Sequence, residues 1–521
     1  TKSPLNTQET SIKAGAGSYE RYNAGLSHYN SIGGNFGYSV NLNYLNEGGY
    51  FENTFRDEKA DDLESFGGRT NLVYQVNENL SFENIINYEK SKQNAYPYAE
   101  YDLENQQIMD INYNQHSYYN RDMFSDGLVT KYKADKFEIT AITSYQYLKD
   151  ENAIDQDLSS DSLFYVIQDQ NQDMFSQEIV MKSRGEKKYD WLLGLWGFHQ
   201  SFTNTVDVDI YGPQMKRLKE YDHDINGYAL FHQSTLNDLF TQGLSFSVGL
   251  RGDYETDRLN YYYLNTVKGN SSVVADTTYP ELNTFEVLPK FSLMYSLASN
   301  MNIYSTVARG YKTGGFNSTF ERPQDLTYKP EYNWNYEFGA KTELFGNKIY
   351  ADFALFYIDW TDQQIYQPVP SGRGSMLKNA GKSTSKGIEF SLQAEPIKRL
   401  QTNFSFGYTD AKFDKYQVDS VTDFSGNYIP YVPKFNASFR AIKTIELGTS
   451  FFYALRVSGK YNLLGKLYWN EENTAYQDTY GIFDLSVTLL TKRFDLDIWA
   501  KNLFNRDYQA FYFEALGSSF A

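Results

Sequence analysis

The sequence contains no cysteine and no long hydrophobic run. Its longest uninterrupted apolar segment, Trp191 to Phe198, has eight residues, whereas a helix that crosses a membrane needs about 20. Any membrane crossing must therefore be made by β-strands. Linkers rich in proline, glycine or serine are also missing, although a soluble chain of 521 residues would usually divide into several domains. The lack of cysteine fits passage through an oxidising compartment without a disulfide scaffold.

Positive charge and metal-binding patterns are scarce as well. With 48 Lys and Arg against 65 Asp and Glu, the net charge is −17, which argues against a nucleic-acid partner. The five histidines show no short metal-ligand spacing. They are His28, His116, His199, His223 and His232. No phosphate-binding loop follows Gly314 and Gly315, and no segment indicates a catalytic triad. We therefore expect no enzyme activity, no metal site and no cofactor.

Aromatic residues, in contrast, are abundant. The chain has 47 Tyr, 37 Phe and 6 Trp, which is more than an ordinary hydrophobic core needs. Tyr and Trp favour the interface between membrane and water, because one end of the side chain is apolar and the other forms hydrogen bonds. The excess therefore predicts the two aromatic girdles of a transmembrane β-barrel.

Apolar and polar residues alternate with a period of two along much of the chain, as expected for strands with one apolar face. The odd positions from Ile349 to Tyr357 form one such face, and Phe483, Leu485, Val487 and Leu489 form another. A third face follows within 494–501. The pattern predicts that one side of the sheet contacts outer-membrane lipid and that the other lines a polar lumen.

Ten short turn signals separate these strands. They lie near Gly34, Glu78, Asp135, Glu186, Leu239, Asn300, Asn347, Ile397, Leu447 and Lys492. Longer polar connections alternate with the short turns. They include Ser91 to Gln115, Asp150 to Asp173, Glu255 to Glu286 and Asp410 to Pro433. In outer-membrane barrels the short turns face the periplasm and the long loops face outside, so the alternation predicts the orientation.

Ten turns with two strands each, plus a first strand near Ser11 to Gly17, give about 21 strands. A closed antiparallel barrel needs an even number. The last recognisable strand lies near Phe494 to Leu503, and a loop-like segment, Arg506 to Ala521, follows it. We therefore expect an all-β, transmembrane antiparallel β-barrel of about 22 strands when complete, with about 21 in this chain.

Four segments in the C-terminal two-fifths resemble TonB-dependent outer-membrane transporters. They are ARGYKTGGFN from Ala308 to Asn317, PEYNWNYEFGAKTELF from Pro330 to Phe345, NAGKSTSKGIEFSLQ from Asn379 to Gln393, and AKNLFNRDY from Ala500 to Tyr508. They occur in the family's order and spacing. The last of them is similar to the family's signature in the penultimate strand.

The resemblance implies a barrel of about 22 strands whose wide lumen holds a folded N-terminal plug. Thr1 to Pro4 is similar to the end of such a plug domain. We therefore expect residues 1–521 to be the barrel domain alone, truncated at both ends, with the plug, the TonB-binding segment and the last strand missing.

The resemblance also suggests a ligand site on the outward side. Cationic side chains would attract an anionic iron chelate, and aromatic faces would stack on planar chelating rings. The candidates are Arg309, Tyr311, Lys312, Phe316, Tyr332 and Trp334. Packing in the aromatic girdle and hydration of the lumen are the alternatives for each of these residues. Tyr261, Tyr262 and Tyr263 are interpreted as a loop edge or an interface belt.

The expected function is energy-coupled import of a scarce nutrient across the bacterial outer membrane, with a ferric siderophore as the expected substrate. The expected partners are membrane lipid, the iron chelate, the TonB system acting through the plug, and an outer-membrane lipoprotein. A passive porin is the first alternative, but porins have about 16 to 18 strands. The second alternative is a barrel that serves as a structural or assembly partner in an outer-membrane complex, without uptake.

Overall fold

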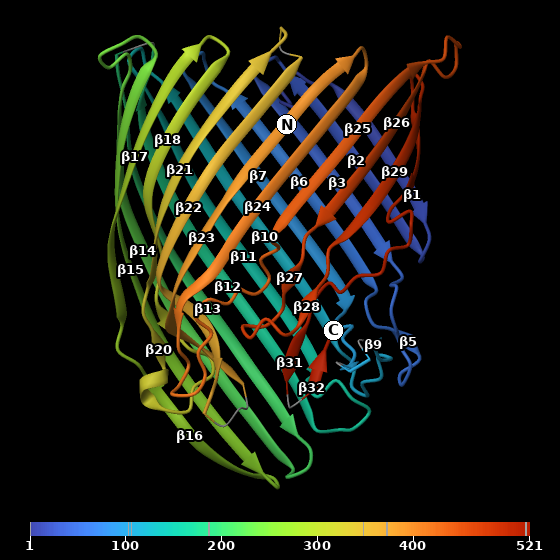
Figure 1. Cartoon of the computed structure of the whole chain (residues 1–521), viewed down its shortest axis with the longest axis vertical. Coiled ribbons are helices and arrows are strands. Elements are labelled where there is room, and N and C mark those ends of the chain that lie inside the picture. The colour runs from blue at the N-terminus through green and yellow to red at the C-terminus, as the bar shows by residue number, and fades with distance from the viewer. Residues whose placement is uncertain are drawn as a thin grey trace. The chain divides into compact units, whose positions relative to one another are not determined.

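The computed structural model describes residues 2–102, 104–105, 107–185, 188–346, 348–370, 374–515 and 518–521. Strands form nearly all of the regular structure (Figure 1). The one helix among these residues is the single 3₁₀ turn η1 (Pro323–Asp325). None of the described residues forms a helix long and apolar enough to span a membrane.

Twenty-two of the described strands belong to one large antiparallel sheet. Strands that follow one another in the chain pair with each other, with short hairpins inserted between some of them. The strands β16 (Asn270–Thr278) and β17 (Leu282–Ala298) both pair with β15 (Leu244–Val267). They therefore occupy one position, and the predicted number of about 21 is confirmed.

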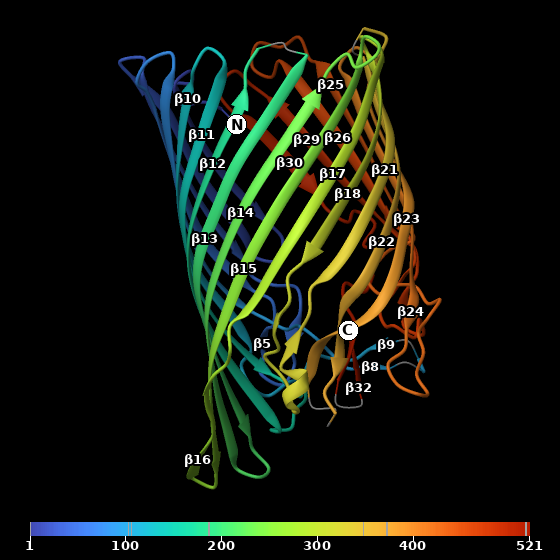
Figure 2. The same ribbon diagram turned by 90° about the vertical axis from the view of Figure 1, so that its left-hand side faces the viewer.

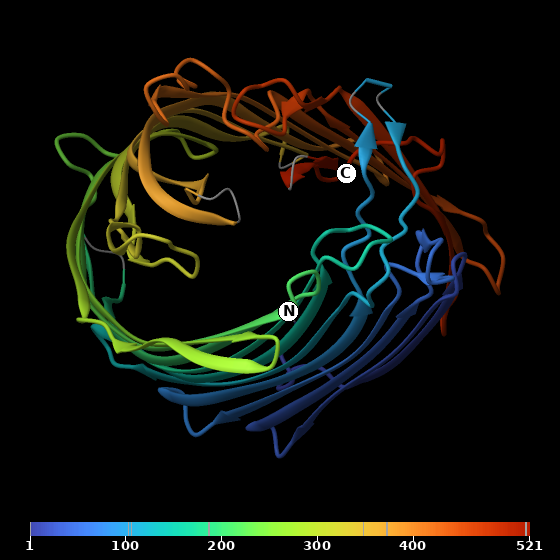
Figure 3. The ribbon, with the colours of Figure 1, turned by 90° about the horizontal axis from the view of Figure 1, so that it is seen from below.

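The chain forms two compact units. Unit 1 comprises residues 1–233, 251–287 and 514–521. Its strands are β1 (Glu9–Gly17), β2 (Arg21–Ile32), β3 (Phe36–Glu47), β6 (Leu63–Gln75), β7 (Leu80–Asn94), β10 (Tyr118–Lys133), β11 (Phe137–Asp155), β12 (Phe164–Ser183), β13 (Tyr189–Ile210), β16 and parts of β14 (Met215–Leu236), β15 and β17. Its small hairpins are β4–β5 (Glu52–Asn53, Glu58–Lys59) and β8–β9 (Tyr101–Asp102, Gln107–Ile108), which lie at the end of the strands away from the short turns (Figure 1). Figure 3 views the chain from that end.

Unit 2 comprises residues 234–250 and 288–513. Its strands are β18 (Met301–Lys312), β21 (Glu331–Leu344), β22 (Ile349–Pro368), β23 (Ser375–Ile397), β24 (Leu400–Tyr416), β25 (Phe435–Glu446), β26 (Ala454–Leu464), β29 (Tyr480–Leu490), β30 (Asp495–Ala500) and parts of β14, β15 and β17. Its short pieces are β19 (Gly315–Phe316), β20 (Thr327–Tyr328), β27 (Leu467–Tyr468) and β28 (Tyr476–Gln477). Two further pieces near the C-terminus, β31 (Phe513–Ala515) and β32 (Ser518–Phe520), belong to unit 1 except for Phe513.

The predicted short turns are confirmed by the described residues. A turn or a strand end falls at eight of the ten predicted positions, whereas Glu186 and Asn347 lie outside the described residues. Two predicted long loops are wrong. Most of 150–173 belongs to β11 and β12, and most of 255–286 belongs to β15, β16 and β17. The many polar residues of these stretches predict loops, whereas the pairing of the strands continues through most of both.

The two faces of the sheet differ as predicted. In β22 the side chains of Phe353, Leu355 and Tyr357 are exposed on one face, while Asp352 lies on the other. Small buried clusters occur instead near the ends of strands, where connections fold over the sheet. One in unit 2 joins Ile365, Phe413 and Tyr416. The sheet therefore has an exposed apolar face where a soluble domain would have a core.

Candidate functional site

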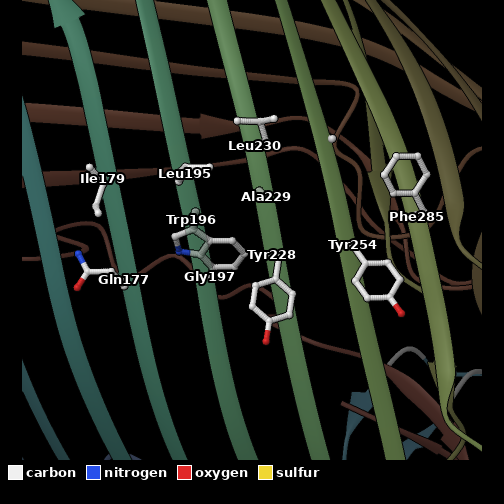
Figure 4. Close-up of a pocket in the computed structure, with 11 residues that line it drawn as sticks. Gln177, Ile179, Leu195, Trp196, Gly197, Tyr228, Ala229, Leu230, Tyr254 and Phe285 are labelled. Carbon is white, nitrogen blue, oxygen red and sulfur yellow. The ribbon is translucent and has the colours of Figure 1, made fainter.

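A pocket of about 470 Å³ lies on the apolar face of unit 1. Figure 4 shows its side chains projecting from neighbouring strands. They belong to Gln177, Ile179, Leu195, Trp196, Gly197, Tyr228, Ala229, Leu230, Gly252, Tyr254 and Phe285. Leu195, Leu230 and Phe285 are each more than half exposed. Because the apolar side chains are open to the surroundings, we interpret this pocket as part of the lipid-facing surface.

A second pocket, of about 310 Å³, is polar and lies in unit 1 beyond the end of β7. We call it the tyrosine pocket. Its lining residues are Asp61, Gln93, Asn94, Ala95, Tyr96, Pro97, Tyr98 and Tyr119. Tyr119 pairs directly with Gln93, and Phe124 pairs with the exposed Tyr88. Successive side chains alternate between faces, so Tyr119 and Gln93 lie on the face opposite Tyr88, which is the lumen side.

The loop that carries Tyr96 and Tyr98 is held firmly at both ends. The Ala95 N–H donates to the Ser117 carbonyl at 3.0 Å. The Asn53 amide donates to the carbonyl of the buried Tyr113, whose hydroxyl donates to the Ala95 carbonyl. Tyr96 has a φ of 62°, a left-handed conformation that is uncommon for a large side chain and often marks functional sites. The loop therefore fixes the direction of the tyrosine ring.

Phenol groups dominate the chemistry of the tyrosine pocket. Burial raises the pKa of Tyr96 to about 12 and also raises the pKa of Tyr98, so both phenols stay neutral and can donate hydrogen bonds. The Tyr119 hydroxyl donates to the Asp150 carboxylate at 3.2 Å. Arg121, which pairs with Asp150 across the strands, donates to Glu89 at 2.6 Å.

Two polar atoms beside this pocket are buried without a hydrogen-bond partner among the described residues. They are Oδ1 of Asp150 and Nε of Arg121. Leaving such atoms unpaired is costly, and most are satisfied in native proteins. The arrangement thus favours a polar ligand that carries both hydrogen-bonding groups and flat rings. No group of three or more His, Asp or Glu able to hold a metal ion occurs in the described part of the chain.

The predicted ligand residues form a different group in unit 2. Arg309 pairs with Trp334, and Tyr311 pairs with Tyr332. The Arg309 guanidinium lies 4.8 Å from the centre of the Tyr332 ring. Along β21, Tyr332 and Trp334 share their face with Tyr336 and Phe338, whose side chains are exposed. The structure thus brings four of the six predicted residues together, but on the apolar face.

The remaining two predicted residues are separated from this group. Lys312 lies opposite Glu331, on the other face of the sheet, and Phe316 lies opposite Thr327 in the small β19–β20 ladder. Arg309, Tyr311, Tyr332 and Trp334 lie on the face where the alternative interpretation, packing in the aromatic girdle, would place them. Ligand binding by the six candidate residues stays a prediction. The tyrosine pocket was missed, although the aromatic run YPYAEY within the predicted loop 91–115 was a usable signal.

A model of the family "TonB dependent receptor-like, beta-barrel" matches residues 6–503. The chain belongs to this family. It therefore has the family's outer-membrane β-barrel fold, and the resemblance and localisation proposed from the sequence are confirmed. The proteins of this family are receptors and transporters, not enzymes.

Relatives of this TonB-dependent receptor include siderophore receptors. The pesticin receptor of Yersinia pestis is 29% identical over 232 residues, which are 44% of this chain and 33% of the relative. The ferric-pyoverdine M114 receptor PbuA of a Pseudomonas strain is 27% identical over 264 residues, 50% of this chain and 28% of the relative. The matches thus span about a third of the length of these curated relatives.

Solved structures share the fold. The ferric yersiniabactin uptake receptor FyuA from Yersinia pestis superposes with a TM-score of 0.86 at 21% identity, covering 100% of this chain and 78% of that chain. The siderophore receptor PiuA from Acinetobacter baumannii gives a TM-score of 0.77 at 14% identity, with 99% and 81% covered.

Proposed function

We propose that this receptor imports a ferric siderophore across the outer membrane. The observation that carries the proposal is the tyrosine pocket, a polar cavity on the lumen side beyond the end of β7 in a TonB-dependent receptor barrel. The siderophore receptors among its relatives support the same substrate class.

Tyrosine rings with hydroxyl donors line this pocket. Planar chelating groups stack on tyrosine rings, and neutral phenols donate hydrogen bonds to the oxygen atoms of a chelate. Beside the pocket, Nε of Arg121 and Oδ1 of Asp150 are buried without a hydrogen-bond partner among the described residues. Binding occurs from outside. A plug, rearranged by periplasmic TonB at the expense of the inner-membrane proton gradient, then admits the chelate, so no covalent chemistry is required.

The test is uptake of iron-55 by a deletion strain under iron limitation, offered a panel of ferric siderophores. The wild-type gene should restore uptake of at least one chelate. Tyr96→Ala with Tyr98→Ala should raise the apparent KM at least about fivefold, since each stacking contact contributes about 0.5–1.5 kcal/mol. Tyr366→Ala, which removes a tyrosine that is 66% exposed in unit 2, is the matched control.

Two results would refute the proposal. One is unchanged uptake of every chelate on deletion of the gene, which would favour a structural role in an envelope complex. The other is an equal rise in KM for the pocket variant and the Tyr366 variant, which would remove the tyrosine pocket from ligand binding. Surface levels of each variant, measured by immunoblotting of outer membranes, separate failed assembly from failed binding.

A further inference from the structure

The lining of the tyrosine pocket is aromatic and acidic. Asp61 is the acidic side chain among its described lining residues, and none of these is Lys or Arg. The rings of Tyr96 and Tyr98 lie 6.3 Å apart, centre to centre, with an angle of 49° between their planes. A cation is attracted to an aromatic ring when it lies within about 6 Å of the ring centre. Two rings at this spacing can therefore both contact one cation.

Asp150 places a second carboxylate beside the pocket. The residue is only 5% exposed, and one of its oxygens accepts the Tyr119 hydroxyl at 3.2 Å. The other oxygen, Oδ1, is buried without a hydrogen-bond partner among the described residues. Burial is the main cause of the raised pKa of Tyr96, and Asp150 adds to it, so this carboxylate lies close to the ring. A buried carboxylate oxygen without a partner is costly, and a positively charged ligand would lower that cost.

Asp62 adds a third carboxylate next to the lining. Its carbonyl accepts the N–H of the lining residue Asn94 at 3.1 Å. Its Oδ1 is likewise buried and lacks a hydrogen-bond partner in the part of the chain that the structure describes. Burial raises the pKa of Asp62, and the carboxylates of Asp61 and Glu58 raise it further. Asp62 thus already lies in a negative field, which would repel an anionic ligand.

Basic side chains do not balance these carboxylates. Arg121 pairs across the strands with Asp150, but its guanidinium donates to Glu89 at 2.6 Å. Within the described residues, no Lys or Arg lies within ion-pair distance of Asp61, Asp62 or Asp150. The pocket and its surroundings therefore carry net negative charge, and a cleft with charge of one sign attracts ligands of the other.

We infer that the tyrosine pocket binds an organic cation, namely a protonated amine or a guanidinium group carried by the imported chelate. The rings of Tyr96 and Tyr98 contact the charge, and the carboxylates of Asp61 and Asp150 balance it. The pocket volume of about 310 Å³ is at the low end for small-molecule sites, so a side group enters and the iron centre stays outside. The inference rests on the proposed function for the role of the pocket in uptake, and it adds the charge of the ligand.

The test compares three small probes of similar size and different charge: n-butylammonium, n-butanol and n-butyrate. Each is titrated at pH 7 into the full chain in a non-ionic detergent, and binding is followed by saturation-transfer difference NMR with the signal of empty micelles subtracted. The dissociation constant of butylammonium should be at least about tenfold lower than those of butanol and butyrate, because a desolvated cation–π contact alone contributes more than that factor.

Two pairs of aspartate variants test the role of charge. Asp61→Asn with Asp150→Asn keeps an acceptor oxygen for the backbone N–H groups and for the Tyr119 hydroxyl. It should weaken butylammonium binding about tenfold and change butanol binding less than about twofold. The matched control is Asp419→Asn with Asp423→Asn, two aspartates of unit 2 that also accept backbone N–H groups. It should leave the binding of all three probes unchanged.

Ring variants test the aromatic contribution. Tyr96→Phe with Tyr98→Phe removes the hydroxyls and keeps the rings, so the preference for butylammonium should be retained within about threefold. Tyr96→Leu with Tyr98→Leu removes the rings and should weaken butylammonium binding about tenfold. Heat-modifiable migration on gels shows whether each variant has folded.

The inference is overturned by any of four results. They are equal affinity for the three probes, tighter binding of butyrate, equal weakening in the pocket variant and its aspartate control, and absence of saturable butylammonium binding. None of these measurements needs iron, a siderophore or uptake. Their failure is therefore distinct from that of the proposed function, which is refuted when deletion of the gene leaves the uptake of every chelate unchanged, whatever charge the pocket prefers.

Discussion

Asp155 provides a pH test of the structure that holds the tyrosine pocket. This carboxyl, at the end of β11, is fully buried, and burial raises its pKa to about 6. Its Oδ2 accepts the Gln115 N–H at 2.9 Å, and its own N–H donates to the Ser117 hydroxyl at 3.0 Å. It thereby fastens the end of the loop that begins with Tyr96 and Tyr98.

The sign of the pH effect follows from the raised pKa. Below the unfolded value of about 3.9 both states are protonated, and the stabilisation is fully present. Between about pH 4 and pH 6 opening of the loop releases a proton, so the stabilisation falls as the pH rises through the folded pKa. A difference of about two pKa units corresponds to roughly 3 kcal/mol. The segment around Asp155 should therefore open more readily at pH 7 than at pH 4.

Hydrogen exchange followed by mass spectrometry measures this opening. Protection factors for peptides covering 113–119 and 153–158, corrected for the intrinsic pH dependence of exchange, should fall about 100-fold from pH 4 to pH 7. Asp155→Asn retains an acceptor for Gln115 and cannot ionise, so its protection should be independent of pH. The reasoning is wrong if the wild-type protection is flat across this range, or if the asparagine variant shows the same fall.

Three further changes test packing and site assignment. Gly227→Val places a Cβ 2.0 Å from the Phe198 ring and should lower the unfolding free energy by about 1–3 kcal/mol, measured by urea titration of detergent-solubilised protein. Gly127→Val introduces its side chain into open space and should lower the unfolding free energy far less. Equal losses in the two variants would contradict the packing. Trp334→Ala should leave siderophore affinity unchanged and lower stability in lipid bilayers, whereas a tenfold loss of affinity by fluorescence titration would restore its predicted ligand role. Tyr119→Phe removes the hydroxyl that donates to the buried Asp150 carboxylate and should lower local stability by about 1–3 kcal/mol. Hydrogen exchange of the β10 amides measures this loss. Unaltered exchange would mean that the hydrogen bond contributes nothing.

The wall of the barrel could be predicted from sequence because each strand carries its own signal. The alternation from Ile349 to Tyr357 identifies β22 without any knowledge of its neighbours, and short turns follow from local residue types. The far ends of the long hairpins, such as β15–β16, could not be predicted in this way. Tyr261 was interpreted as a loop edge or belt residue, whereas it is 5% exposed and its ring packs against Tyr221 and Tyr279, residues that lie far from it in the sequence.

The candidate site was harder to predict than the wall, since it depends on register and on loop packing. Alternation from Phe338 back to Trp334 could have placed Trp334 on the apolar face, but only the pairing with β18 places Arg309 beside it. The tyrosine pocket joins Asp61, Tyr96 and Tyr119 from three separate segments. Nothing in the sequence near any one of them indicates the other two.

The β15–β16 hairpin, at the lower end of the view in Figure 2, has a consequence for how such receptors change length during evolution. Its tip is Lys268–Gly269, and its strands pair from Val267 and Asn270 onward, with one irregularity between Tyr263 and Leu264. Inserting one residue in a ladder exchanges the two faces of every following residue, unless a bulge absorbs it. In relatives with a longer or shorter hairpin here, the length of the hairpin should therefore differ by an even number of residues, shared equally between the two strands. An odd difference in length should coincide with an extra or a lost bulge.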